Sequence, residues 1–182
     1  GDVYKRQELF GKKLDAEALC AVGDKIGADV PLCIKGGTLY SITSGDMIAA
    51  ECDTNCVFVC IYPDFTLSTA EAYAKYDENP TEINPHYADF VSSIVCGSLS
   101  EGAGFISNVF TEIYHDSRIE EMKTDLLESG AVISEMTGSG SVVFGVFESE
   151  ETAVDAKNIL SGKYPNVFMT RPVNCGVYVI ER

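Results

Sequence analysis

Two short apolar runs separated by a glycine turn constrain the fold of this chain more than any other feature. The runs AVISEM and SVVFGVF flank the four residues Thr137–Gly140, which read TGSG. A glycine turn between two such runs predicts a pair of antiparallel strands. Helical patterns lie on both sides, at 118–129 and 149–160, and another strand pattern follows in NVFMTRP. This order predicts an α+β fold in which helices cover one antiparallel sheet.

Before the hairpin, helix and strand patterns alternate along the chain. Asp15 is expected to cap a helix that ends at Gly27, and Pro31 follows it. Two short strands are expected around Gly36-Gly37 in LCIKGGTLYSI, and a buried strand is expected in VFVCIYP. Helices are expected in STAEAYAKYD, in HYADFVSSIVCGS and at 108–115, and a final strand is expected in CGVYVIER.

A break in composition near residue 50 predicts two domains of unequal size. The expected parts are a remnant of an amino-terminal domain at 8–50 and a carboxy-terminal domain at 51–182. Residues 1–7, GDVYKRQ, match the in-frame translation of a sequencing adapter, whose codons GAT GTG TAT AAG AGA CAG encode DVYKRQ. The alternative is an ordinary exposed amino terminus. On the adapter interpretation, the native protein extends upstream of Glu8 and residues 1–7 take no part in the fold.

Composition excludes several classes of function. The 182 residues carry a net charge of −15, whereas a general nucleic-acid binder needs a basic surface. No apolar run approaches the roughly 20 residues that span a bilayer, and no signal peptide is visible, so no membrane partner is expected. The seven cysteines are an odd number scattered through apolar segments, which favours buried free thiols and a cytoplasmic location. A metal loop at Cys52 and Cys56 is the alternative, but no CxxC pair supports it.

Three short segments contain residues that suit phosphate or hydroxyl chemistry. Asp29, in GADVP, follows a helix and precedes a proline, so its carboxylate could accept a proton from a substrate hydroxyl; an Asx turn is the alternative. The turn at Thr137–Gly140 could bring backbone N–H groups close to an anion, or serve only as a hairpin turn. Ser68 and Thr69, at an expected helix start, could bind a phosphate or could simply cap the helix.

Together and in this order, the segments resemble the GHMP kinase superfamily. The resemblance rests on KIGADVPLCIKGGT, YPDFTLSTAEAY, Asn108 and GAVISEMTGSGSVVFGVF, and it extends from Glu8 to Arg182. Within that superfamily, the IGADVP block is most similar to the branch that phosphorylates the 2-hydroxyl of a cytidyl-diphosphate methylerythritol in non-mevalonate isoprenoid biosynthesis. The resemblance implies the end of a GHMP kinase amino-terminal domain followed by the α+β carboxy-terminal domain.

The resemblance also implies roles for individual residues. Asp29 would be the catalytic carboxylate. Ala28, Ser68 and Thr69 would lie near the substrate. The glycine motif of the family corresponds to Thr137, Gly138, Ser139 and Gly140, which would support the phosphates.

The expected cofactors are ATP and Mg²⁺, both bound largely by a part of the enzyme upstream of Glu8. The expected partners are the small-molecule substrate and ATP, with no nucleic acid. Without residues 1–7 the chain has 11 basic and 27 acidic residues, a net charge of −16, and it gathers no basic cluster for a triphosphate. The isolated chain is therefore expected to be inactive. Two alternatives stay open: another GHMP kinase acting on a different alcohol, and a non-catalytic α+β ligand-binding module.

Overall fold

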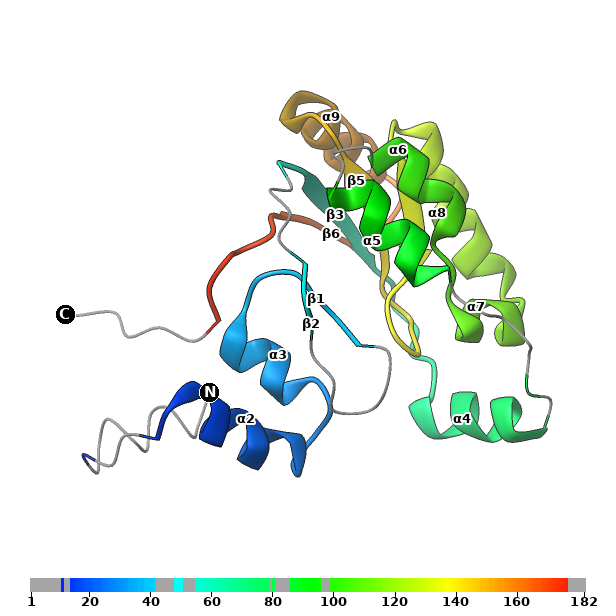
Figure 1. The fold of residues 1–182 in the computed structure, drawn as a ribbon. Helices are drawn as coiled ribbons and strands as arrows, with labels where there is room; N and C mark the ends of the chain where they lie inside the picture. The colour runs from blue at the N-terminus through cyan, green and yellow to red at the C-terminus, as the bar shows by residue number, and fades with distance from the viewer. Residues whose placement is uncertain are drawn as a thin grey trace. The chain divides into compact units, whose positions relative to one another are not determined.

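The computed structural model of the protein consists of two compact units. One comprises Gly1–Cys52 and Pro172–Arg182, and the other comprises Asp53–Arg171 (Figure 1). The residues that the structure describes are 11, 14–41, 48–50, 55–78, 80, 86–95 and 99–176. The tail from Pro172 groups with the first unit, although the sequence analysis placed it in the second domain. Most of the final strand expected in CGVYVIER lies outside the described residues.

The first unit contains two helices and a short hairpin. Helix α2 (Ala16–Asp24) begins after Asp15, whose side chain accepts a hydrogen bond from the Ala18 N–H at 2.7 Å, so the expected cap is confirmed. Strands β1 (Leu39–Tyr40) and β2 (Ile48–Ala49) pair antiparallel.

The expected strand in LCIK is wrong, because this segment belongs to helix α3 (Val30–Lys35). Pro31 occupies the first turn of α3, where its fixed φ suits a helix and its missing N–H costs nothing. The helix ends at Gly36, whose N–H donates to the Leu32 carbonyl at 2.8 Å. A short apolar run between a proline and a glycine suits a buried helix as well as a strand, so its periodicity could not separate the two.

The second unit is built on a four-stranded antiparallel sheet, with strand order β4-β5-β3-β6. The strands are β3 (Val57–Tyr62), β4 (Ile133–Met136), β5 (Val143–Phe147) and β6 (Asn166–Thr170). The expected antiparallel pair on either side of the glycine turn is confirmed as β4 and β5, with Met136 opposite Val143. The α+β class is therefore confirmed.

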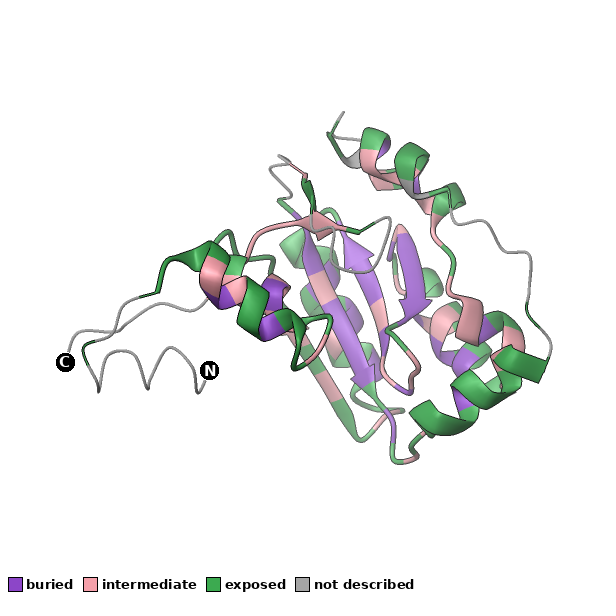
Figure 2. Ribbon diagram, turned by 60° about the horizontal axis from the view of Figure 1, so that its bottom comes forward, coloured by how far each residue is buried: buried purple, intermediate pink, exposed green. Residues whose placement is uncertain are grey.

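Helices cover both faces of this sheet. On one face, α8 (Ser117–Glu128) packs over β4 and β5, and α9 (Glu150–Leu160) packs over β3 and β6 (Figure 2). Their shared core contains these residues: Val57, Val59, Ile61, Ile119, Met122, Leu126, Val143, Phe147, Ala153, Ala156 and Leu160. Ile133 and Val146 point to the opposite face, where α5 (Tyr87–Val95) and α6 (Leu99–Gly102) contribute Phe90 and Leu99.

Two further helices of the second unit pack against each other. Helix α4 (Thr69–Glu78) packs against α7 (Val109–Tyr114), and a short 3-10 turn, η1 (Ala103–Phe105), follows α6. Within the described part of the chain, no helix has the length and apolarity needed to cross a bilayer.

The cysteines differ from the expected pattern of buried thiols. Cys56 and Cys60 are buried, and burial raises the pKa of the Cys60 thiol. Cys33 and Cys175, however, are exposed, so the expectation is wrong for these two. Cys52 and Cys96 lie outside the described residues.

Candidate functional site

The glycine turn Thr137–Gly140 connects β4 to β5 and is closed by backbone hydrogen bonds. The Thr137 N–H donates to the Val142 carbonyl at 2.9 Å, and the Gly140 N–H donates to the Thr137 carbonyl at 3.0 Å. Gly138 and Gly140 have φ values of 55° and 92°, which side chains with a Cβ rarely adopt. Thr137 and Gly138 are exposed, and both backbone groups of Thr137 are used to close the turn.

The start of helix α4 lies against this turn. The Thr69 and Ser139 hydroxyl oxygens are 2.8 Å apart and share a hydrogen bond, although the two residues are 70 positions apart in the chain. The Ser68 hydroxyl accepts from the Glu71 N–H at 3.3 Å, so Ser68 does cap the helix. The structure thus brings together two of the three segments that sequence analysis selected.

Three further contacts fix the loop that leads from β3 to α4. The Ser141 hydroxyl donates to the Phe65 carbonyl at 2.6 Å, and the Arg118 guanidinium lies 3.7 Å from the centroid of the Phe65 ring. The Tyr114 hydroxyl donates to the Ser68 carbonyl at 3.0 Å. Burial, together with the negative charge of Glu71, raises the pKa of Tyr114, so this hydroxyl keeps its proton at neutral pH.

Asn108 connects helix α7 to the glycine turn. Its side-chain oxygen caps α7 by accepting from the Phe110 N–H at 2.9 Å, and its amide nitrogen donates to the Met136 and Gly138 carbonyls at 2.7 and 2.8 Å. One side chain therefore begins a helix and binds the backbone on both sides of Thr137. In the sequence, Asn108 was noted only as part of the resemblance to GHMP kinases, and no role was predicted for it.

A pocket of about 540 Å³ opens beside the turn. Its wall is mostly apolar, with polar groups at Ser107, Asn108, Glu135 and Thr137, and its lining residues include Ile106, Val109, Phe110, Met136 and Phe144. Concave sites of this size, lined by apolar side chains and a few polar groups, are typical of small-molecule binding.

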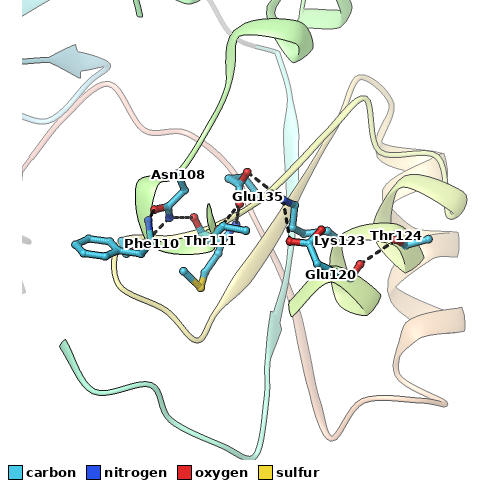
Figure 3. A network of polar contacts seen from close by, with 9 residues as sticks. Asn108, Phe110, Thr111, Glu120, Lys123, Thr124 and Glu135 are labelled. Carbon is cyan, nitrogen blue, oxygen red and sulfur yellow. Dashed lines mark hydrogen bonds and ion pairs between the residues drawn. The ribbon is translucent and has the colours of Figure 1, made fainter. Parts of the chain in front are cut away.

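Glu135 is a residue that sequence analysis missed. It lines the pocket and is only 7% exposed, and its carboxylate contacts Thr111 and Lys123 (Figure 3). The sequence does contain a signal for this residue, because Glu135 is the sole charged residue in the run AVISEM. Charged residues are almost never fully buried unless they are paired.

Asp29 and Ala28 belong to the first unit, and both are exposed. Asp29 directly precedes helix α3, and its side chain makes no capping hydrogen bond to that helix. Pro31, two residues further on, has no N–H to donate, so the Asx turn considered as the alternative is not observed. The Asp29 carboxylate is therefore open to solvent and to a ligand.

The site brings two hydroxyl groups and a helix start beside an exposed turn, and this combination suits a phosphate group. Among the residues that the structure describes, no group of three or more His, Cys, Asp and Glu side chains is arranged to hold a metal ion.

Comparison with known proteins agrees with this geometry. Residues 108–166 match the family described as GHMP kinases C terminal, a segment that contains both Asn108 and the glycine turn. A 4-diphosphocytidyl-2-C-methyl-D-erythritol kinase of Caldanaerobacter subterraneus subsp. tengcongensis is 30% identical over 175 residues, which are 95% of this chain and 61% of that protein. One from Clostridium perfringens is 32% identical over 172 residues, 92% of this chain and 60% of that protein. The chain thus spans about three fifths of the length of these relatives.

Solved structures show the same fold at lower sequence identity. A homoserine kinase from Cytophaga hutchinsonii matches with a TM-score of 0.74 at 19% identity, over 93% of this chain and 62% of that one. A 4-(cytidine 5'-diphospho)-2C-methyl-D-erythritol kinase matches with a TM-score of 0.66 at 18% identity, over 90% and 59%. Residues 108–166 therefore match the carboxy-terminal domain of GHMP kinases, and the chain shares the fold of these two solved kinases.

Proposed function

We propose that this chain is part of an enzyme that transfers a phosphoryl group from ATP to the 2-hydroxyl of 4-diphosphocytidyl-2-C-methyl-D-erythritol, a step in isoprenoid precursor biosynthesis. One structural observation supports the proposal. The Thr69–Ser139 contact joins a helix start to the glycine turn, and this combination suits the binding of a phosphate. The sequence relatives that bear this enzyme's name match over 92–95% of the chain and favour this substrate over other alcohols.

In the proposed reaction Asp29 accepts the proton of the substrate hydroxyl while the oxygen attacks the γ-phosphorus of ATP, the bond from that phosphorus to the bridging oxygen breaks, and ADP leaves. The exposed carboxylate, free of a helix-capping bond, supports this role. Ala28, Ser68 and Thr69 lie near the substrate, and the turn Thr137–Gly140 contributes to the phosphates its hydroxyl groups and the backbone N–H groups that do not close it. Positioning of this kind supplies much of the catalysis in phosphoryl transfer.

Mg²⁺ is the expected counter-ion of ATP, and when bound it neutralises charge on the phosphates. The described residues alone hold no metal-ligand cluster, so we derive no step through the metal.

The test is a kinase assay on the longest open reading frame that contains this chain, with ATP, Mg²⁺ and the cytidyl-diphosphate substrate. Asp29→Asn is expected to lower kcat by about 10²–10⁴-fold, because a general base contributes about that much. Asp24→Asn is the matched control, since Asp24 is also exposed and lies at the end of the preceding helix. Full activity of Asp29→Asn would contradict the assigned role and favour the non-catalytic alternative.

Two further arms separate the remaining possibilities. A panel that includes homoserine and mevalonate tests for a different GHMP kinase, because a higher kcat/KM on either alcohol would replace the proposed substrate. The 182-residue chain by itself is assayed in parallel and is expected to show little turnover, since its net charge of −15 opposes the binding of ATP.

A further inference from the structure

A buried hydrogen bond joins helix α7 to strand β4. The Thr111 hydroxyl donates to Glu135 Oε1 at 2.8 Å, and the two residues are 6% and 7% exposed. Both side chains lie beneath the surface of a strongly acidic chain, where an unpaired carboxylate would be unfavourable.

The Glu135 carboxylate has donors on both oxygens. Oε1 also accepts from the Met136 N–H at 2.8 Å, and Oε2 accepts from Lys123 Nζ at 3.2 Å (Figure 3). Lys123 extends from helix α8 and contacts Glu120 at 3.5 Å as well. The ammonium charge and the two neutral donors satisfy a carboxylate that would otherwise be costly to bury.

Asn108 continues the same network on the other side of Met136. It is the N-cap of α7 and lies three residues before Thr111, so both side chains extend from the first turn of that helix. The Asn108 amide donates to the Met136 carbonyl at 2.7 Å and to the Gly138 carbonyl at 2.8 Å. Helix α7 is thus linked to both backbone groups of Met136. The link to the Met136 N–H runs through Glu135, and the link to the Met136 C=O runs through Asn108.

Packing alone does not determine the conformation of the turn at Gly138. A Cβ built at Gly138 would meet no atom within 4 Å, so the space on that side of the residue is open. The Gly138 carbonyl accepts a hydrogen bond from the Asn108 amide, which orients this peptide.

We propose that Thr111 and Glu135, together with Asn108 and Lys123, form a clamp by which helix α7 sets the conformation of the glycine turn. Thr111 and Glu135 are positioning residues: they bind no phosphate themselves but fix the strand end from which Ser139 and the turn amides extend. The consequence for phosphate binding rests on the proposed function, whereas the clamp itself is a property of the folded chain.

Amide hydrogen exchange on the full chain tests the clamp without any substrate. Thr111→Val removes the hydroxyl at nearly constant volume and is expected to speed exchange of the Thr137 and Gly140 amides about tenfold, since the buried Glu135 Oε1 loses one of its two donors. Thr124→Val is the matched control, because the Thr124 hydroxyl makes an equally short 2.8 Å bond to the Glu120 carbonyl of its own helix. Thr111→Ser restores the hydroxyl and is expected to restore slow exchange.

The proposal is overturned if Thr111→Val and Thr124→Val change the two turn amides equally, or if Thr111→Ser fails to restore protection. It is also overturned if amides of α8 and α9 accelerate as much as those of the turn, because the effect would then be general destabilisation. In the kinase assay, Thr111→Val is expected to raise KM about tenfold with a smaller change in kcat. If the exchange results are as expected but the unsubstituted protein shows no kinase activity, the proposed function is rejected and the clamp proposal stands.

Discussion

At the scale of single residues, glycine is required at the two positions of the turn for different structural reasons. Gly138 has a positive φ but open space around it. A Cβ at Gly140 would lie 2.7 Å from Met136 Sδ and 2.8 Å from Leu67 Cδ1, in addition to requiring a φ of 92°. Gly138 is therefore selected by backbone conformation, whereas Gly140 is selected by conformation and by close packing.

This difference predicts unequal effects of substitution by alanine. Gly138→Ala is expected to lower the free energy of unfolding by about 1 kcal/mol, from backbone strain alone. Gly140→Ala is expected to lower it by about 2–3 kcal/mol, because two core side chains must also move. Urea denaturation of both variants measures the difference, and equal losses would show that the packing around Gly140 adjusts freely.

A second residue-scale feature joins α8 to the segment after α9. Lys163 Nζ lies 2.6 Å from Asp125 Oδ2 and 2.7 Å from Glu121 Oε1, and the Tyr164 hydroxyl also donates to Asp125. Burial opposes ionisation of Asp125, but the hydrogen bonds from Lys163 and Tyr164 outweigh it and lower the pKa of the carboxyl. Burial and the bond to Asp125 raise the pKa of Tyr164 to about 12.

A lowered pKa in the folded state stabilises the fold above the unfolded-state pKa, and this contribution is lost as the pH falls through the folded-state pKa. Asp125→Asn is therefore expected to reduce stability by about 1 kcal/mol at pH 7. The difference from the unsubstituted chain should shrink below about pH 4. Urea denaturation at several pH values measures it, with the exposed Asp155→Asn on α9 as the control. A constant difference down to pH 2 would argue against the ionic contribution.

At the scale of elements, local sequence signals located most helices and strands. Asp15, Asn108, Asp116 and Ser149 each cap a helix through a side-chain oxygen, and polar residues of these types are the usual caps. Helix α3 was missed because its six residues are too few to show a helical period. Capping is decided within about four residues, so it can be predicted from sequence more reliably than the identity of a short apolar run.

Adjacent leucines on α8 test which face of that helix supports the sheet. Leu126 is fully buried between α8 and the strands, whereas Leu127 is 48% exposed. Leu126→Ala is expected to reduce stability by about 3 kcal/mol through lost burial and a residual cavity. Leu127→Ala is expected to change stability by at most about 0.5 kcal/mol. Similar effects from thermal or urea denaturation of the two variants would contradict the assigned packing face.

At the scale of the whole molecule, the two core clusters of the second unit are formed entirely by residues between Cys56 and Met169. Each face of the sheet is packed by helices from the same stretch of chain, and that stretch lies within Asp53–Arg171. A unit that contains its own core is expected to fold by itself.

Residues 53–171 expressed alone are therefore expected to fold. Their urea midpoint should lie within about 0.5 M of that of the corresponding transition in the full chain, because the buried apolar surface is retained. Circular dichroism and urea denaturation measure it. Strong binding of a hydrophobic dye together with a non-cooperative transition would show that the second unit depends on the rest of the chain.

The sequence by itself determined the α+β class, the antiparallel pair around TGSG, the helix caps at Asp15 and Ser68, and the resemblance to GHMP kinases, because each depends on residues close together in the chain. Only the tertiary structure decided the strand order, the Thr69–Ser139 contact and the burial of Glu135 beside Thr111 and Lys123. These contacts join residues 12 to 70 positions apart. No local pattern encodes such pairings, since they arise only when the sheet and its covering helices pack together.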